Sequence, residues 1–212
     1  MRIGILGGTG PAGRGVGIRL ALAGHEVMLG SRHAERAEEV AAEVNLANVS
    51  GGGNQAAAQF GDVVVLSVPW EAAMPTAVEV EPQLRGKVLL SMANAVVFID
   101  RKPEPIVPSS GSLALGIQAR LPNVRVVAAL HHVPARSLIE TDVKLDFDVL
   151  CVSDDRGALD RVMELVNSID GLRAVDAGGL LNASALEALT PLLIALNSRY
   201  KTRTGVQIVG IE

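Results

Sequence analysis

Three observations predict an α/β fold in which helices cover both faces of a parallel sheet. Short apolar segments of strand type alternate with Ala-rich segments of helical periodicity along most of the 212 residues. A glycine-rich turn follows the first apolar segment. The Val/Leu run at 62–68 lacks polar alternation, as a strand buried on both faces requires. We therefore expect a doubly wound sheet of the Rossmann type, followed by a small C-terminal α/β domain.

The elements expected in the first part of the chain follow strand–helix order. Strands are predicted at 2–6, 25–29, 62–68, 87–92 and 124–130. Helices are predicted at 16–22, 31–44, 70–84 and 112–121. Between them, the sequence indicates a polar, flexible loop at 48–54 and a proline-rich stretch at 101–108 that breaks regular structure.

The last part of the chain repeats this pattern on a smaller scale. Segments 147–152 and 172–176 are predicted strands on either side of a helix at about 155–169. A long apolar helix is expected at 184–200, before a short tail at 205–212. This helix and the apolar tail favour a homodimer.

Length and composition bound the class of protein. We expect two tightly packed domains, residues 1–122 and residues 123–212, because no linker is recognisable. A net charge of −4 without a basic tract argues against nucleic acid as a partner. Cys151 is the single cysteine and cannot form an internal disulfide. No signal peptide is recognisable and no apolar run approaches about 18 residues, so we expect no membrane association and a cytoplasmic location.

The residues Gly8-Thr9-Gly10-Pro11-Ala12-Gly13 match the pattern G-x-G-x-x-G between a strand and a helix. In this context the first glycine permits a tight turn, the second lets a pyrophosphate approach the backbone, and the third lets helix and strand pack closely. The helix N-terminus adds free N–H groups and the positive end of its dipole. A glycine-rich turn that binds nothing is the alternative, but the context favours a dinucleotide.

The end of the second strand indicates which dinucleotide binds. An NAD site places Asp or Glu there for the ribose 2′-hydroxyl, whereas this chain has Gly30-Ser31-Arg32. Ser31 can donate a hydrogen bond to a 2′-phosphate, and Arg32 can pair with it or stack on the adenine. Arg36, one helical turn further on, adds a second positive charge. Both arginines could be ordinary solvated residues at a helix start, but with the missing acid they favour NADP.

Val68-Pro69-Trp70 stands at the carboxyl end of the strand predicted at 62–68, where open α/β sheets bind ligands. The proline cannot continue the strand ladder, so the chain turns outward. Trp70 then either shields the nicotinamide half of the cofactor or anchors the following helix in the core, and the sequence favours neither role.

Motifs along essentially the whole chain resemble the family of F420H2:NADP oxidoreductases, which pass hydride between reduced 8-hydroxy-5-deazaflavin (coenzyme F420) and NADP. The first are Leu6-Gly7-Gly8-Thr9-Gly10, Gly24-His25-Glu26 through Gly30-Ser31-Arg32, and Val68-Pro69-Trp70-Glu71. The more specific ones follow in order: Ala129-Leu130-His131-His132-Val133-Pro134-Ala135, Ile169-Asp170-Gly171-Leu172-Arg173, Asp176-Ala177-Gly178 and Leu186-Glu187-Ala188-Leu189-Thr190-Pro191-Leu192.

The resemblance implies an N-terminal domain for NADP and a C-terminal domain that closes a deep cleft over the deazaflavin. It implies that the NADP site is lined by Thr9, Gly10, Pro11, Ala12, Ser31, Arg32, Arg36, Val68, Pro69, Trp70 and Ala73. It implies that the deazaflavin contacts Asn94, Ala95, His131, Val133, Pro134, Val206 and Gln207. The chain departs from better-known archaeal members at Ser91-Met92-Ala93-Asn94-Ala95 and from Lys201 onward.

The chemistry fits this resemblance, because hydride transfer between two cofactor rings needs no protein nucleophile, acid or base. His131, at a strand end, could hydrogen-bond the polar edge of the deazaflavin and stabilise negative charge there. The alternative is a structural histidine satisfied by backbone groups, which is the role expected of His132. Adjacent histidines without a third ligand are a poor metal signature. Cys151 is expected to be an inert buried thiol, and Asp154-Asp155 to cap the following helix.

Three other functions remain open from the sequence. An NADP-dependent reductase of a small imine, ketone or carboxylated compound would need a proton donor, for which Lys144, Tyr200 and Lys201 are candidates outside any recognisable motif. Ferric reductase relatives share the fold and pass electrons to a flavin. An NADP-sensing regulatory module would bind NADPH and turn nothing over.

Overall fold

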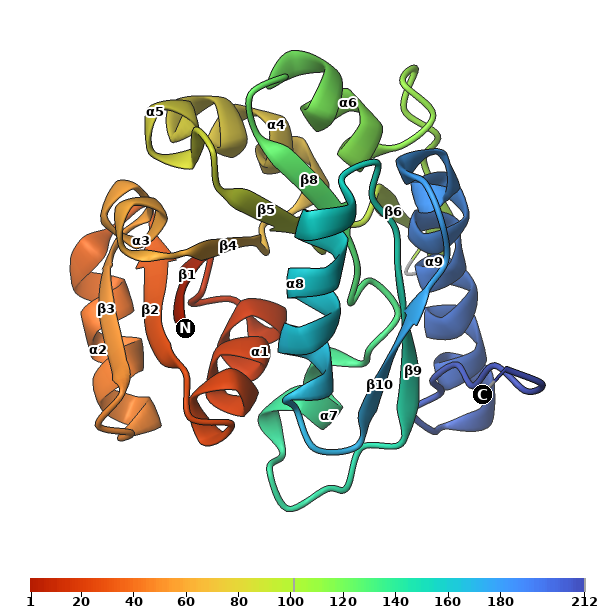
Figure 1. The fold of residues 1–212 in the computed structure, drawn as a ribbon. Coiled ribbons are helices and arrows are strands. Elements are labelled where there is room, and N and C mark those ends of the chain that lie inside the picture. The colour runs from red at the N-terminus through yellow and green to blue at the C-terminus, as the bar shows by residue number, and fades with distance from the viewer. Residues whose placement is uncertain (101, 212) are drawn as a thin grey trace.

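The computed structural model describes residues 1–100 and 102–211, so the predictions for residues 101 and 212 lie outside the described part. Its centre is a six-stranded parallel sheet in the order β3-β2-β1-β4-β5-β8 (Figure 1). The strands are β1 (Arg2–Leu6), β2 (Glu26–Ser31), β3 (Val49–Gly53), β4 (Val63–Leu66), β5 (Val88–Ser91) and β8 (Arg125–Ala128). The strand order reverses between β1 and β4, which confirms the predicted doubly wound fold and creates the crevice where such sheets bind ligands.

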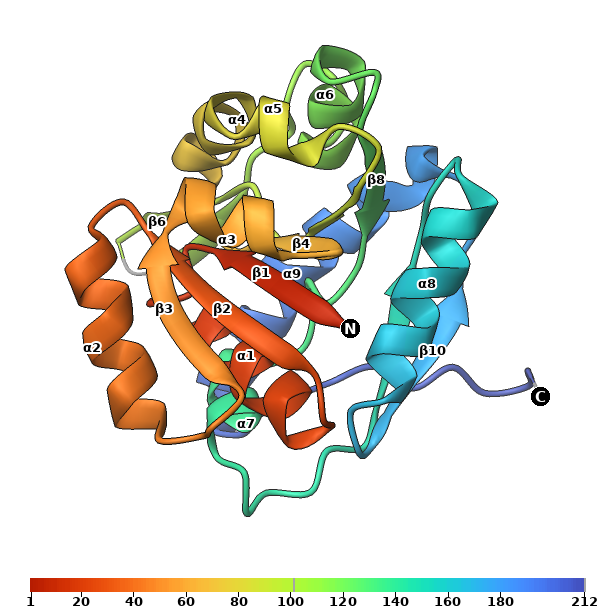
Figure 2. The same cartoon turned by 60° about the vertical axis from the view of Figure 1, so that its left-hand side comes forward.

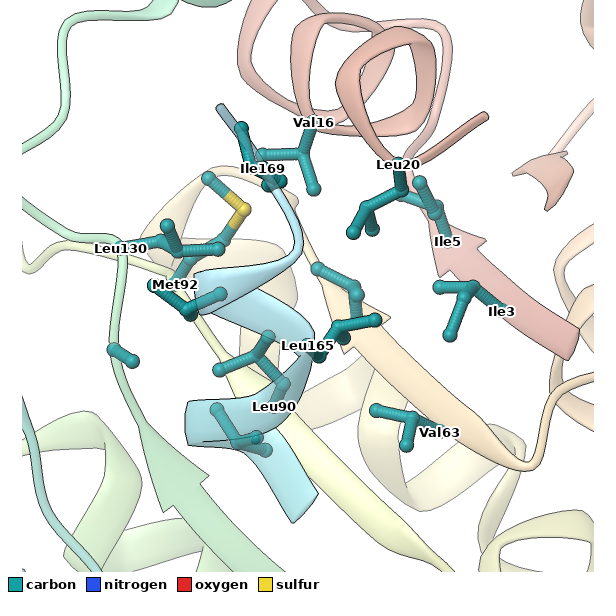
Figure 3. Close-up of a cluster of buried hydrophobic side chains, with 14 of the residues drawn as sticks. Ile3, Ile5, Val16, Leu20, Val63, Leu90, Met92, Leu130, Leu165 and Ile169 are labelled. Atoms are coloured by element: carbon teal, nitrogen blue, oxygen red, sulfur yellow. The ribbon is translucent and has the colours of Figure 1, made fainter. Parts of the chain in front are cut away.

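Helices cover both faces of this sheet (Figure 1). The first six are α1 (Pro11–Leu22), α2 (Ala34–Val44), α3 (Asn54–Phe60), α4 (Trp70–Glu79), α5 (Glu81–Leu84) and α6 (Leu113–Arg120). Alternate residues of β4 enter different layers: Val63 and Val65 pack with α1, whereas Val64 and Leu66 pack with α3 and α4. Figure 3 shows the first layer, where strand and helix side chains meet. Burial on both faces explains why the strand sequences are continuously apolar.

The C-terminal part packs beside the sheet. Its elements are α7 (Ala135–Ile139), β9 (Phe147–Cys151), α8 (Arg156–Asn167), β10 (Leu172–Asp176), the 3₁₀ turn η1 (Leu180–Asn182) and α9 (Ala183–Tyr200). The strands β9 and β10 form a separate parallel pair with α8 against it (Figure 2). Asp155 caps α8 as expected, accepting a hydrogen bond from the Ala158 N–H at 2.8 Å. Strand β8 follows the expected boundary at residue 122 yet pairs with β5, so the division into two domains stays a proposal.

The flexible loop predicted at 48–54 is wrong, because this segment forms β3 and the start of α3. Its composition, Ser-Gly-Gly-Gly, disfavours a strand. The packing explains the glycines: a Cβ on Gly51 would lie 2.2 Å from the Ala37 carbonyl oxygen. Helix α2 therefore rests directly on the strand backbone, which requires glycine and hides the strand from a propensity argument.

The proline-rich stretch at 101–108 was predicted to break regular structure, and this too is wrong for the described residues. Residues Val96–Ile99 (β6) and Lys102–Pro105 (β7) form an antiparallel pair outside the main sheet. Pro103 and Pro105 are two residues apart, so their nitrogens lie on the same edge of β7. In a two-stranded ribbon that edge can face away from the partner strand, where a missing N–H costs no ladder hydrogen bond.

Segment Leu180–Tyr200 is long and apolar enough to cross a membrane by length and composition, with a mean hydropathy of 1.4. The expectation that no apolar run approaches this length is therefore wrong. Length and composition alone also describe helices of soluble cores, and they assign no membrane role here. In this structure α9 is docked on α6: the buried Glu187 carboxylate accepts hydrogen bonds from the N–H groups of Leu113 at 2.9 Å and Ala114 at 3.1 Å. Burial raises the pKa of Glu187 to about 7, and those two hydrogen bonds oppose the rise.

Candidate functional site

The turn between β1 and α1 is built from glycines that the surrounding protein requires. Gly7, with φ of 74°, makes the tight turn that was expected at Gly8. A Cβ on Gly8 would lie 2.9 Å from the Leu29 backbone, and one on Gly13 would lie 2.8 Å from the Gly7 carbonyl oxygen. The Gly8 N–H donates to the Gly30 carbonyl at 2.8 Å, which joins the turn to β2. These contacts confirm the close strand–helix packing expected of the motif.

Gly10 differs from its neighbours because the protein leaves space beside it. A Cβ there would meet only the Gly7 oxygen, at an ordinary contact distance of 3.5 Å. Gly10 is also the N-cap of α1, and no side chain caps this helix end. Protein packing therefore does not explain a glycine at this position. An anion approaching the bare N-terminus of α1 would explain it.

The residues predicted to select NADP lie at the end of β2 and the start of α2. Ser31 is the last residue of β2 and is buried, with its Oγ accepting a hydrogen bond from the His33 N–H at 3.2 Å. Arg32 is exposed and forms no ion pair within the described chain. Arg36 is exposed and pairs with Glu39 at 2.9 Å. Arg32 is thus the freer of the two cations.

The end of β4 leads directly into α4. Pro69 is the N-cap of this helix, Trp70 is its first residue, and Ala73 is fully buried in the core beneath it. Trp70 packs against the same core, as its anchor role requires. Its indole Nε1 is buried without a hydrogen-bond partner, which favours a polar group beside it that the chain does not supply. Val68 is half-buried and also packs on this core.

A cleft of about 1000 Å³ opens between the carboxyl ends of β5 and β8, the start of α7 and one side of α9. It brings together five of the predicted site residues: Ala12, Asn94, His131, Val133 and Pro134. The wall supplied by α9 and the residues after it was not predicted; its members include Thr190, Leu193, Ile194, Asn197, Lys201, Arg203 and Thr204.

Three of the predicted deazaflavin contacts lie outside this lining. Ala95 is buried beside it in the core. The carbonyl of Val206 accepts a hydrogen bond from the Asp148 N–H at 2.8 Å, so Val206 runs along β9. Gln207 lines a different hollow of about 480 Å³ next to β9 and β10. The tail after Lys201 therefore lies against the C-terminal strands beyond Thr204.

His131 sits where the chain leaves β8. Leu130 before it has φ of 65°, a left-handed conformation that non-glycine residues rarely adopt and that often marks functional sites. The imidazole is buried, and neither ring nitrogen has a hydrogen-bond partner of ordinary geometry. Burial, with a smaller contribution from His132, lowers the pKa of His131 to about 3, and the nearby Ala93 backbone opposes both effects. At neutral pH the ring is neutral and offers one donor and one acceptor.

A hydrogen-bond network that the sequence did not reveal fixes the backbone of His131. Thr190 of α9 reaches the Asn94 Oδ1 at 2.7 Å and the His131 carbonyl at 2.9 Å. The Asn94 amide also donates to that carbonyl, at 3.3 Å. A hydroxyl inside the apolar segment Leu189-Thr190-Pro191 was the signal available. Nothing local in the sequence pairs it with residues 59 and 96 positions away.

Of the groups expected to be structural, Cys151 is an inert buried thiol, whereas His132 makes a structural hydrogen bond but also lines the cleft with its Nδ1 buried and unpartnered. His132 Nε2 hydrogen-bonds the Asp148 carbonyl at 2.8 Å. Cys151 is fully buried, and burial raises the pKa of its thiol to about 12, which makes it an inert thiol. Across residues 1–100 and 102–211, no group of three or more His, Cys, Asp or Glu side chains could hold a metal ion.

Comparisons with known proteins agree with the motifs. The family described as NADP oxidoreductase, coenzyme F420-dependent, matches residues 2–95. The chain is 38% identical, over the full length of both proteins, to a protein of Methanocaldococcus jannaschii named F420-dependent NADP reductase. It is 39% identical to one of the same name from Methanothermobacter marburgensis, covering 100% of this chain and 99% of that protein. The chain belongs to the F420-dependent NADP reductase family.

A solved structure supports the same family. A crystal structure from Arthrobacter sp. FB24, provisionally named as an F420-dependent NADP reductase, superposes with a TM-score of 0.87 at 25% identity. The match covers 99% of this chain and 100% of that one. The fold of an F420-dependent NADP reductase thus extends through α9 and the tail, beyond the residues that the family profile matches.

Two of the three proton donors considered for a carbonyl or imine reductase lie away from the cleft. Lys144 lines the hollow beside β9, and Tyr200 is largely exposed. Lys201 lines the cleft at the end of α9. Its side chain is exposed to solvent.

Proposed function

We propose that this protein is an enzyme that transfers hydride reversibly between reduced coenzyme F420 and NADP. The sequence identity of 38% and 39% to F420-dependent NADP reductases, which extends over the whole chain, supports this function. The observation that carries it is the cleft, which brings residues from the N-terminus of α1, the end of β5 and the end of β8 to one space. The cleft therefore adjoins the glycine-rich turn that would bind the dinucleotide, and it has room for a second flat ring.

We propose that the turn around Gly10 holds the pyrophosphate of NADP, with Thr9, Pro11, Ala12 and Gly13 around it. The open side of Gly10 and the uncapped N-terminus of α1 support this role. Ser31, Arg32 and Arg36 would bind the 2′-phosphate, with Arg32 the stronger contact because Glu39 pairs with Arg36. The unpartnered Nε1 of Trp70 would meet a polar group of the cofactor beside Val68 and Pro69. Ala73, which is fully buried, would contribute indirectly by letting α4 pack close to the sheet.

The two cofactors, when bound, supply the hydride chemistry themselves, and the protein's part is to orient them and exclude water. The reacting carbons must be held about 3 to 3.5 Å apart. Val133 and Pro134 would form the wall against which the deazaflavin lies, and Asn94 would bind its edge beside Ala95. His131, neutral at working pH, would donate one N–H to the deazaflavin's polar edge while its carbonyl stays fixed by Thr190.

We also propose a homodimer in the cytoplasm. Exposed apolar side chains gather on the β6–β7 pair and its continuation, where Phe98 is 61% and Val107 is 78% exposed. The outer face of α9 adds Leu192. Apolar surface of this kind favours association between copies. Light scattering coupled to size exclusion would measure a dimer mass, and a monomer at micromolar concentration would contradict this part of the proposal.

An absorbance assay at the deazaflavin band tests the activity. Reduced F420 with NADP should regain its oxidised band, and NAD should be far slower. No change with NADP, together with NADPH oxidation by a small imine or ketone, would establish the carbonyl or imine reductase instead. Tight NADPH binding without turnover of either class would establish a regulatory module.

A further inference from the structure

The lining of the cleft carries positive charge although the whole chain is acidic. Arg136, Lys201 and Arg203 line it, and no Asp or Glu does. The net charge of the chain is −4. A positively charged cleft in a negatively charged protein attracts anionic ligands.

These cations are solvent-accessible, whereas the fully buried residues of the lining are mostly apolar. Arg136 and Lys201 are exposed and Arg203 is half-buried. Deeper in the cleft, Leu130 and Val133 are buried together with the neutral His131. The cleft is thus suited to a ligand with a flat uncharged body and an anionic extension.

One carboxylate, Glu140, approaches this group of cations. Arg203 donates to it at 2.9 Å through Nη2, and the Arg136 Nε lies 3.9 Å from the same Oε1. Arg203 lowers the pKa of Glu140, so this carboxylate is charged at neutral pH. Three cations and one anion leave an excess of two positive charges. Lys201 has no ion pair in the described residues and contributes its charge undiminished.

The backbone of Lys201 gives an independent reason to assign it a role. Lys201 is the C-cap of α9 and adopts a left-handed conformation, φ 51° and ψ 44°. Such caps are normally Gly or Asn, and α2 ends in this way on Asn45, with φ 54° and ψ 43°. A lysine at this position is conformationally unfavourable. A lysine in this conformation beside the cleft points to a ligand contact.

We propose that Lys201, with Arg136 and Arg203, forms a cationic rim that binds the phosphate and glutamate carboxylates on the side chain of the deazaflavin. This inference rests on the proposed function. It makes the rim a determinant of specificity for the complete cofactor over its ring portion. The rim acts on binding and leaves the hydride step to the buried part of the cleft.

The variant Lys201→Gly separates binding from folding. Glycine suits the left-handed cap, so the melting temperature should stay the same or rise. Loss of one exposed charge contact should raise KM for F420 about fivefold, with kcat unchanged. Arg199→Ala removes a cation of the same helix end that is exposed but outside the cleft lining, and should leave KM unchanged.

A second substrate makes the test specific to the anionic side chain. The deazaflavin ring with only its ribityl chain lacks the phosphate and glutamates, so Lys201→Gly should leave its KM unchanged. Added salt should raise KM for F420 in the wild type and less in Lys201→Gly. If Lys201→Gly leaves KM for F420 unchanged, or raises KM equally for F420 and the ring compound, the proposed cationic rim is wrong. Wild-type turnover of the ring compound upholds the proposed function in either case, whereas failure of both substrates would reject that function itself.

Discussion

The two ends of the proposed active site are constructed in different ways. The NADP end depends on seven consecutive residues, Gly7 to Gly13, whose backbone makes the turn. The deazaflavin end depends on side chains from β5, β8, α7 and α9, brought together by tertiary packing. The backbone turn tolerates little change in conformation, and side chains elsewhere, such as Arg32, would add the contacts that choose between NADP and NAD. A site of assembled side chains can be altered one contact at a time.

The largest effect should come from Gly10→Val. Its side chain would fill the space assigned to the pyrophosphate, so we expect a loss of NADP affinity of about 100-fold or more, comparable to several lost charge-assisted contacts. The open surroundings of Gly10 predict little change in melting temperature. Fluorescence titration with NADPH measures the first quantity and thermal denaturation the second.

Gly13→Val is the matched control for this prediction. A Cβ there would already lie 2.8 Å from the Gly7 oxygen, so the fold itself should be destabilised. Equal affinities for NADPH in the wild type and a well-folded Gly10→Val protein would show that the turn does not bind the pyrophosphate.

Replacing His131 tests the other end of the site. His131→Asn should lower kcat by about 10- to 100-fold if the ring stabilises charge on the deazaflavin, with little change in KM for NADP. Because burial lowers the pKa of His131 to about 3, wild-type kcat should show no step from this group between about pH 5 and 8. Steady-state kinetics across this range measures both, and a kinetic pKa near 6.5 that disappears in His131→Asn would contradict the neutral ring.

The same histidine affects stability with a defined sign. Its pKa falls from about 6.5 in the unfolded chain to about 3 in the folded one. Its contribution is therefore present above pH 6.5 and is lost as pH falls toward 3. His131→Asn should lose less stability than the wild type in acid, as measured by denaturant unfolding at each pH. His132, whose pKa burial also lowers, contributes in the same direction in both proteins.

Arg32→Ala should change the choice between cofactors. Loss of a charge-assisted contact to the 2′-phosphate predicts a rise of about 10-fold in KM for NADP and little change for NAD. Arg36→Ala should have a smaller effect, since Glu39 already pairs with Arg36. Equal effects of Arg32→Ala on both cofactors would refute its assignment.

The smallest effect should follow Thr190→Val. This change removes the hydrogen bonds to Asn94 and the His131 carbonyl while keeping the side-chain shape. We expect KM for F420 to rise about threefold to fivefold, with KM for NADP unchanged, as for the loss of about one hydrogen bond. Thr190→Ser should restore the wild-type value. A rise in KM for NADP of the same size would show that α9 acts on the whole fold.

The contrast between the two ends also decides what the sequence could predict. The motif Gly8 to Gly13 and the missing acid at Ser31 are local patterns, so the turn, the fold class and the NADP end followed from them. The wall from Thr190 to Thr204 was missed because its residues meet His131 only through folding. Val206 and Gln207 were expected at the cleft by resemblance, in the part of the tail where this chain departs from its relatives.

Helix α6 depends on Glu187, a residue of helix α9 near the end of the chain. Glu187 supplies acceptors for the first amides of α6 from 73 residues downstream. A fragment that stops at residue 122 would expose those amides and the apolar side of α6 that α9 covers. Attempts to produce the nucleotide-binding half alone should therefore yield a fragment with a frayed α6. A newly synthesised chain would complete that helix only after α9 has left the ribosome.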